Sequence, residues 1–233
     1  MSNSDGFIEE VTDELRRDKL FATMKRYAWI AALAVIAIVG GAAYNEYRKD
    51  QIEARAQALG DGMVAALATQ DDAERAQALA SIEAETPEAQ AVLDMLTAAE
   101  QADAGDISAA VTRLDGVAVN AEIPAVYRAI AQFKSLILQA ETLPSSDRRQ
   151  GFEALAQPGS LMRLLAEEQL ALIDIQEGQT DGAISRYQAI LTDAEVTPDL
   201  QERAVQVIVA LGGDPDLAGS PDLTPDGATA TGN

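Results

Sequence analysis

The sequence of 233 residues contains no cysteine and no histidine. It therefore has no Ser-His-Asp or Cys-His catalytic arrangement, no zinc site built on thiolates or imidazoles, and no intramolecular disulfide bond. Aromatic residues make up only 4% of the chain, and 17 basic residues face 38 acidic ones, a formal net charge of −21. Because nucleic-acid binding relies on clustered lysine and arginine, we expect no nucleic-acid partner.

Alanine, by contrast, is strongly enriched. It accounts for 45 residues of the chain. Alanine is the best helix former, whereas aromatic residues favour sheets. No window shows the alternation of a strand, so the sequence predicts an all-α protein.

Residues 28–44 hold no charged side chain. Extended to 27–47, the stretch covers 21 residues, and a helix of that length spans roughly 30 Å, the thickness of a hydrocarbon core. Aromatic side chains expected at membrane interfaces stand near its two ends: Tyr27, Trp29, Tyr44 and Tyr47. We therefore predict one N-terminal transmembrane helix over 27–47, with a buried core helix as the alternative.

The charges around this segment predict its orientation. Five basic residues precede it within 1–26, and three follow it closely, which favours a cytoplasmic N-terminus and an exported body. A cleaved signal peptide is the competing interpretation, because the small residues 40–43 suit a peptidase. The 26-residue acidic leader favours an uncleaved anchor.

The negative charge lies almost entirely after the predicted membrane helix. Residues 48–233 carry 31 acidic and 12 basic groups, a net charge of −19. We predict a cytoplasmic leader (1–26), which is either an amphipathic helix or a loose tail, then the transmembrane helix (27–47) and a helical domain (48–211). The remainder, 212–233, is rich in glycine, proline and aspartate and is predicted to be a disordered tail.

Start and stop signals divide the helical domain into short helices. The triplets 86–88 and 197–199 each combine a threonine cap, a proline and an acidic residue, which is typical of a helix start. Helices are predicted over about 52–69, 71–85, 87–105, 106–119, 124–142, 147–156, 160–177, 181–193 and 198–211. Gly60 and Gly62 are expected to weaken the first of these locally.

The helices show an internal repeat. Alternate helices begin near residues 53, 87, 124 and 160, a period typical of helical hairpins. Segments 104–114 and 177–187 align at a separation of 73 residues. A glycine, an alanine and a bulky residue recur in them: Gly105, Ala110 and Leu114, then Gly178, Ala183 and Tyr187. Because one hairpin cannot bury its own apolar face, we expect an α-solenoid of about four hairpins, with 198–211 as a capping helix.

This pattern resembles tetratricopeptide repeats. The resemblance implies that the glycine closes the first helix of a pair, that the small residue lets the helices approach, and that the bulky residue fills their interface. Ala98 and Ala171 fit the small position of the first helices. The tryptophan, tyrosine and closing proline of the family pattern are missing, so the resemblance rests on the second and fourth hairpins.

The layout of leader, membrane helix and Ala-rich acidic repeat domain is similar to the YfgM-like family, as are segments 7–18 and 40–47. Members of that family are ancillary subunits of the SecYEG translocon. The resemblance implies a single-pass protein of the bacterial inner membrane with a periplasmic C-terminal domain. Its implied partners are the SecYEG translocon, a membrane-anchored periplasmic chaperone and exported chains. A repeat scaffold in envelope assembly or cell division is the alternative.

Chemical motifs do not suggest an enzyme. The sequence has no P-loop, dinucleotide fingerprint or EF-hand pattern, so we predict a non-enzymatic protein with no catalytic residue, cofactor or metal. Acidic pairs at 71–72, 83/85 and 167–168 are interpreted as solvated helix faces. The aromatic residues of the domain are interpreted as core contacts, with a peptide groove as the alternative: Tyr127, Phe133, Phe152 and Tyr187.

Overall fold

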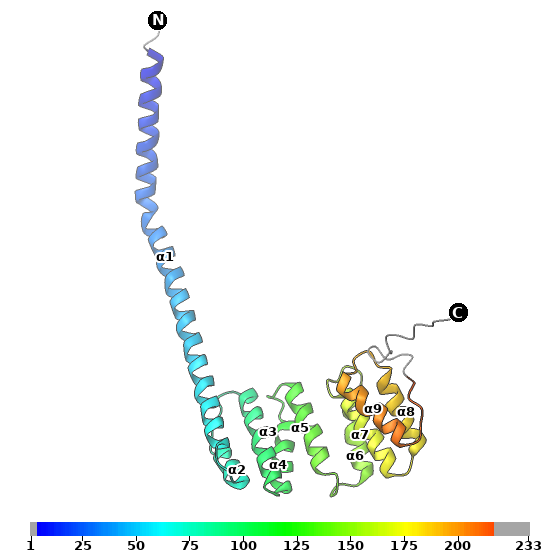
Figure 1. Cartoon of the computed structure of the whole chain (residues 1–233). Coiled ribbons are helices and arrows are strands. Elements are labelled where there is room, and N and C mark those ends of the chain that lie inside the picture. The colour runs from blue at the N-terminus through cyan, green and yellow to red at the C-terminus, as the bar shows by residue number, and fades with distance from the viewer. Residues whose placement is uncertain (1–3, 217–233) are drawn as a thin grey trace, which may run out of the picture. The chain divides into compact units, whose positions relative to one another are not determined.

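The computed structural model describes the backbone of residues 4–216 and the side chains of Trp29, Leu33 and residues 36–216. Within these residues the regular structure is helical and no strand is present (Figure 1), which confirms the all-α prediction. The helices are α1 (Ser4–Leu67), α2 (Asp72–Ala80), α3 (Pro87–Asp103), α4 (Ile107–Val119), α5 (Ala125–Leu138), α6 (Ser145–Leu155), α7 (Arg163–Gln176), α8 (Thr180–Leu191) and α9 (Pro198–Ala210).

The chain divides into two compact units, residues 1–61 and 62–233. Helix α1 is continuous, and the described large apolar side chains from Trp29 to Ile52 are exposed. Among the side chains that the structure describes, no helix presents an apolar stretch sufficient to cross a membrane. Within the predicted membrane segment 27–47, the structure describes the side chains of Trp29, Leu33 and residues 36–47. The side chains of the leader and of Tyr27, and the predicted tail beyond residue 216, lie outside the described residues.

Side-chain caps begin two of the helices where the sequence predicted them. The hydroxyl of Thr86 accepts a hydrogen bond from the Ala89 amide at 3.2 Å at the start of α3. The carboxylate of Asp106 accepts one from the Ala109 amide at 3.0 Å at the start of α4. Each cap satisfies a backbone donor that the first helical turn leaves free, which stabilises the start by about 1 kcal/mol.

Two other predicted starts differ in detail. Helix α7 begins at Arg163 and not near 160, because the Ser160 hydroxyl accepts from the Met162 amide at 3.2 Å in the turn before the helix. Thr197 makes no side-chain cap hydrogen bond at the start of α9.

The end of α2 was predicted too late. The helix ends at Ala80 and not near 85. The Ser81 hydroxyl donates to the Ala78 carbonyl at 2.7 Å. Serine bonded in this way competes with helix propagation, so the chain leaves the helix at this point.

Within residues 62–233, consecutive helices from α2 to α9 pack against one another (Figure 1), which is consistent with an α-solenoid. Helix α3 also contacts α5. Buried apolar residues form clusters along this stack, each shared by neighbouring helices. Their centres include Leu79 and Leu93 between α2 and α3, Ala110 and Ala131 between α4 and α5, Phe152 and Leu170 between α6 and α7, and Leu191 and Ile208 between α8 and α9.

Helices α2–α5 and α6–α9 repeat one another at a separation of 73 residues. Helix α3 ends at Asp103 and α7 at Gln176, and α5 begins at Ala125 where α9 begins at Pro198. Fully or nearly fully buried residues recur at the same separation: Leu79 and Phe152, Ala98 and Ala171, Ala110 and Ala183, Leu114 and Tyr187, Val117 and Ile190, Ala131 and Ala204. We call α2–α5 the first copy and α6–α9 the second copy.

The last helix, α9, is part of the second copy and not only a cap on the stack. The sequence predicted a capping helix over 198–211, and α9 occupies in the second copy the position that α5 has in the first. The 73-residue separation extends beyond the two hairpins that resemble each other in sequence, because the core positions of α5 and α9 match as well.

The two copies join where α5 meets α6. The rings of Phe133 and Phe152 make an edge-to-face contact there, with centroids 5.7 Å apart and an interplanar angle of 70°. A Cβ atom at Gly151 would lie 2.7 Å from the Leu136 side chain. The glycine therefore permits a close approach of the two helices at the junction.

Substitution of Gly105 or Gly178 by alanine is expected to lower the free energy of unfolding by about 1 kcal/mol, measured by urea denaturation. Both glycines have positive φ, 84° and 74°, and no atom within 4 Å of a built Cβ, so the cost is conformational and not steric. Gly116 is the matched control, because it lies inside α4 with equally open space. Gly116→Ala is expected to stabilise the protein by up to about 1 kcal/mol. Equal effects at the three sites would contradict this account.

Candidate interaction surface

The residues predicted to pack the repeats lie at helix–helix contacts in both copies. The six with side chains are at most 1% exposed: Ala98, Ala110, Leu114, Ala171, Ala183 and Tyr187. The two glycines end α3 and α7, where the Gly105 amide donates to the Ala102 carbonyl at 2.9 Å and the Gly178 amide to the Ile175 carbonyl at 3.0 Å. The six buried side chains shape the fold and do not form an accessible surface, whereas the two glycines are exposed in the turns that follow α3 and α7.

The aromatic residues fall into two groups. Phe152 and Tyr187 are buried, and burial raises the pKa of Tyr187 to about 12, so its phenol is neutral at physiological pH. Tyr127 and Phe133 are only half-buried, Tyr127 against the core of α3–α5 and Phe133 against the core that contains Phe152. The predicted membrane-interface residues whose side chains are described are all exposed: Trp29 by 63%, Tyr44 by 65% and Tyr47 by 61%.

In the first copy an arginine connects α4 to α3. The Arg113 Nη1 atom lies 2.7 Å from Asp94 Oδ1, and its Nε donates to Gln101 Oε1 at 3.3 Å. Asp94 and Gln101 are two turns apart on one face of α3, so a single guanidinium reaches both.

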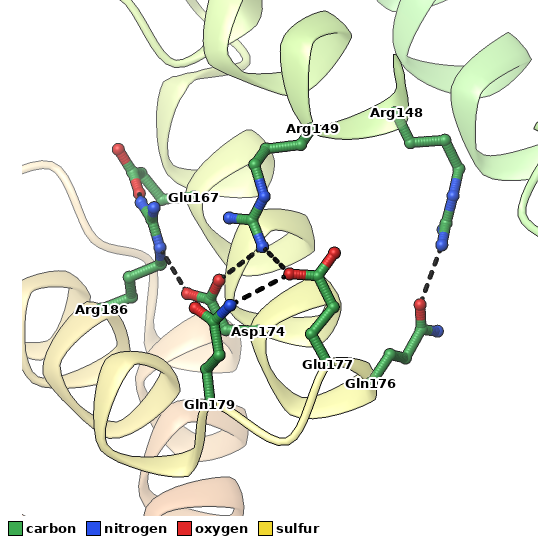
Figure 2. Close-up of polar contacts among 8 residues, drawn as sticks. All are labelled: Arg148, Arg149, Glu167, Asp174, Gln176, Glu177, Gln179 and Arg186. Atoms are coloured by element: carbon green, nitrogen blue, oxygen red, sulfur yellow. Dashed lines mark hydrogen bonds and ion pairs between the residues drawn. The ribbon is translucent and has the colours of Figure 1, made fainter. Parts of the chain in front are cut away.

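In the second copy the corresponding arginine makes the same two contacts, with a carboxylate in place of the amide of Gln101. Arg186 Nη1 lies 2.7 Å from Glu167 Oε2, and its Nε lies 2.8 Å from Asp174 Oδ2. All three residues stand 73 positions beyond their counterparts. Asp174 is buried and also accepts from Arg149 of α6, which reaches Glu177 as well, each at 2.8 Å (Figure 2). One carboxylate thus joins α6, α7 and α8.

Each of these arginines borders an open groove between two antiparallel helices. The first groove, between α3 and α4, has a volume of about 820 Å³, and its lining includes Gln90, Asp94, Arg113, Gly116, Asn120 and Glu122. The second groove, between α7 and α8, has a volume of about 350 Å³, and its lining includes Arg163, Glu167, Arg186, Ala189 and Asp193. The five residues named for the second groove stand 73 positions beyond five of those named for the first, and Glu122 corresponds to Glu195, which follows Asp193 in the adjoining loop.

The second groove holds an arginine of the chain itself. Arg163 places Nη1 2.8 Å from Asp193 Oδ2 and Nη2 3.0 Å from Asp193 Oδ1, a bidentate fork. Its Nη2 also lies 2.6 Å from Glu195 Oε2. The hydrogen bond from Arg163 lowers the pKa of Asp193, and the two carboxylates raise that of Arg163.

Two of the acidic pairs interpreted as solvated helix faces, 71–72 and 167–168, have specific partners instead, and the third, Glu83 and Glu85, is exposed in the loop between α2 and α3 and not on a helix. Asp71 caps α2 through the Glu74 amide at 2.9 Å. Glu168 pairs with Arg203 of α9 at 2.8 Å, beside the Glu167 pair already described. Within the described side chains, no group of three or more acidic residues is placed to hold a metal ion.

The grooves were not predicted from the sequence, although one signal was present. Arg113 and Arg186 stand at equivalent positions of the two aligned segments, and a shared cation in a strongly acidic domain indicates shared acidic partners. The partners lie on a different helix from the arginines, so their identity required the packing. No protein-family model, curated protein or solved structure matches the chain.

Proposed function

We propose that the protein is a non-enzymatic, membrane-anchored scaffold that binds other proteins through its helical repeat. The observation that carries this proposal is the first groove, an accessible depression of about 820 Å³ between two packed helices, whose lining carries three acidic residues and one basic residue. Its walls are the sides of α3 and α4, whose opposite faces pack into the core. A surface held in this way is preorganised, which lowers the entropy cost of binding a partner.

The anchor in this proposal is the segment 27–47. Exposed apolar side chains along this part of α1, including Ile36, Ile38 and Val39, support it, since a large exposed apolar surface is costly in water. Attachment to the membrane raises the effective concentration of the repeat near a membrane partner, so modest contacts suffice for association.

The finer part of the proposal follows the resemblances. The repeat is of the tetratricopeptide type, and the protein is a YfgM-like ancillary subunit of the SecYEG translocon with its repeat in the periplasm. Its partners are then the translocon, a membrane-anchored periplasmic chaperone and exported chains. The closing glycines and the small and bulky positions in α3–α4 and α7–α8 support the repeat type.

In-cell photo-crosslinking is the test of this function. A photoreactive residue at Thr112, which is exposed beside the first groove, is expected to capture envelope proteins that mass spectrometry identifies as translocon or chaperone subunits. The matched control places it at Glu202, exposed on α9 away from that groove. A folded variant lacking 27–47 is expected to lose the translocon products.

Failure to capture these partners would reject the proposal. If the intact chain captures neither a translocon subunit nor a periplasmic chaperone from either position, the export role is wrong. Capture of cell-division or envelope-assembly proteins would favour the alternative scaffold role.

A further inference from the structure

Each groove is bordered by a loop, and the two loops have the same backbone hydrogen bonds. In the second copy the Glu195 amide donates to Asp193 Oδ1 at 2.9 Å, and in the first the Glu122 amide donates to Asn120 Oδ1 at 3.0 Å. The following amides also match, since Ile123 donates to the Asn120 carbonyl at 3.2 Å, as Val196 does to that of Asp193 at 3.3 Å. The two loops therefore hold the Oδ1 atoms of Asp193 and Asn120 alike, although Asn120 has an amide nitrogen where Asp193 has its second oxygen.

Arg163, which fills the second groove, has no cationic counterpart in the first copy. Position 90, which corresponds to Arg163, is glutamine. Its Oε1 accepts from the Ala84 amide at 3.3 Å in the α2–α3 loop and does not reach Asn120 or Glu122. Among the described residues, no side chain forms an ion pair with the Glu122 carboxylate.

The charges of the two grooves differ accordingly. Asp94, Asp106 and Glu122 line the first groove with one cation, Arg113, which is already engaged by Asp94. The second groove balances Glu167 and Asp193 with Arg186 and Arg163. The first groove is also the larger, about 820 Å³ against 350 Å³. It thus has both the room and the uncompensated negative charge that a guanidinium requires.

We propose that the first groove binds an arginine side chain of a partner protein, with its guanidinium directed at Asn120 Oδ1 and the Glu122 carboxylate. The second groove shows the binding mode, because Arg163 makes that contact within the chain. Arginine is preferred over lysine because its guanidinium carries several fixed N–H donors on a weakly hydrated plane, and one of its nitrogens can reach both oxygens, as Nη2 of Arg163 does in the second groove. This inference rests on the proposed scaffold function and specifies the chemistry of its partner. The acidic domain also attracts cationic segments at long range.

The direct test is titration of the full, ¹⁵N-labelled chain in a zwitterionic detergent with the peptide acetyl-Ala-Ala-Arg-Ala-Ala-amide at low ionic strength. Amide shifts are expected at Gly116, Asn120 and Glu122, and not at Ala189 or Asp193. The same peptide with citrulline in place of arginine keeps the shape but not the charge, and we expect it to bind about tenfold more weakly.

Two reciprocal substitutions sharpen the test. Gln90→Arg supplies the first groove with its own guanidinium and is expected to abolish the peptide shifts there. Arg163→Gln removes the guanidinium from the second groove and is expected to produce a new set of shifts at Ala189, Asp193 and Glu195. Because one variant loses a site and the other gains one, a folding defect cannot reproduce both results, and the dispersion of the remaining amide signals checks the fold.

The proposal is overturned if the citrulline peptide, or the same peptide with lysine in place of arginine, binds as well as the arginine peptide, or if Gln90→Arg leaves the shifts unchanged. It is also overturned if wild-type shifts are equal in the two grooves, which would indicate non-specific attraction to an acidic surface. Crosslinking separates this inference from the scaffold function. If partners are captured equally by the wild type and by Gln90→Arg, the scaffold stands and the arginine groove is wrong. If no partner is captured by the wild type, the scaffold itself is wrong.

Discussion

Truncation of Tyr187 to alanine is expected to lower the free energy of unfolding by about 3–5 kcal/mol, the largest effect of any substitution considered. The side chain is 1% exposed and is the largest residue fully enclosed in the stack, where α7, α8 and α9 converge. Its removal forfeits the transfer free energy of the ring and leaves a cavity that surrounding helices fill only in part. Urea denaturation at pH 7 measures this loss while the phenol, with its pKa of about 12, remains neutral.

The control for this substitution is Val209→Ala on α9. Val209 is 57% exposed, so its truncation is expected to change stability by no more than about 0.5 kcal/mol. A conservative variant, Tyr187→Leu, introduces the residue that the first copy has at this position. It is expected to lower the free energy of unfolding by less than Tyr187→Ala does. If Tyr187→Ala costs less than about 1.5 kcal/mol, the second core is not packed around this ring.

Replacement of Asp174 by asparagine is expected to destabilise the protein by about 2–3 kcal/mol, the second largest effect. The carboxylate accepts from both Arg149 and Arg186 at 2.8 Å and is buried. Asparagine keeps the size but removes the charge, which leaves two partly buried guanidiniums with one carboxylate each. The expected cost is below that of a fully buried pair because the side chains of both arginines keep contact with water, by 22% and 31%.

Gln101 provides the matched control, because it is the neutral counterpart of Asp174 in the first copy. Gln101→Ala removes one hydrogen bond to Arg113 and is expected to cost about 0.5–1.5 kcal/mol. Amide hydrogen exchange separates the two effects further, with faster exchange in α6–α8 for the Asp174 variant and in α3–α4 for the Gln101 variant. Similar losses from the two substitutions would show that the carboxylate contributes no more than an amide.

The positions of most helices were predictable because their starts are local. Thr86 and Asp106 cap the amides three residues later, a contact that depends only on sequence neighbours. Gly105 and Gly178 end helices for an equally local reason, since their positive φ suits glycine. The end of α2 was misjudged because the sequence shows no glycine or proline between Ser81 and Pro87, and the hydrogen bond of the Ser81 hydroxyl competes with the helix.

The grooves were less predictable because their residues belong to different helices. The alignment of 104–114 with 177–187 already contained Arg113 and Arg186, but Asp94 and Gln101 precede the aligned segment. The correspondence of Gln90 with Arg163 falls still further upstream, where the two copies share little sequence. Only the packing of α3 against α4, and of α7 against α8, identifies these residues as equivalent.

The helical class, the starts of most helices and the pairing of small and bulky positions follow from the amino-acid sequence, because each depends on residues within one or two turns. The packing of the helices was needed to show that α9 is the counterpart of α5, that Asp174 joins three helices, and that Arg163 fills a groove whose counterpart holds Gln90. The physical reason is the range of the interactions. Caps and glycine turns are local, whereas the partner of a long, charged side chain depends on which helix faces meet.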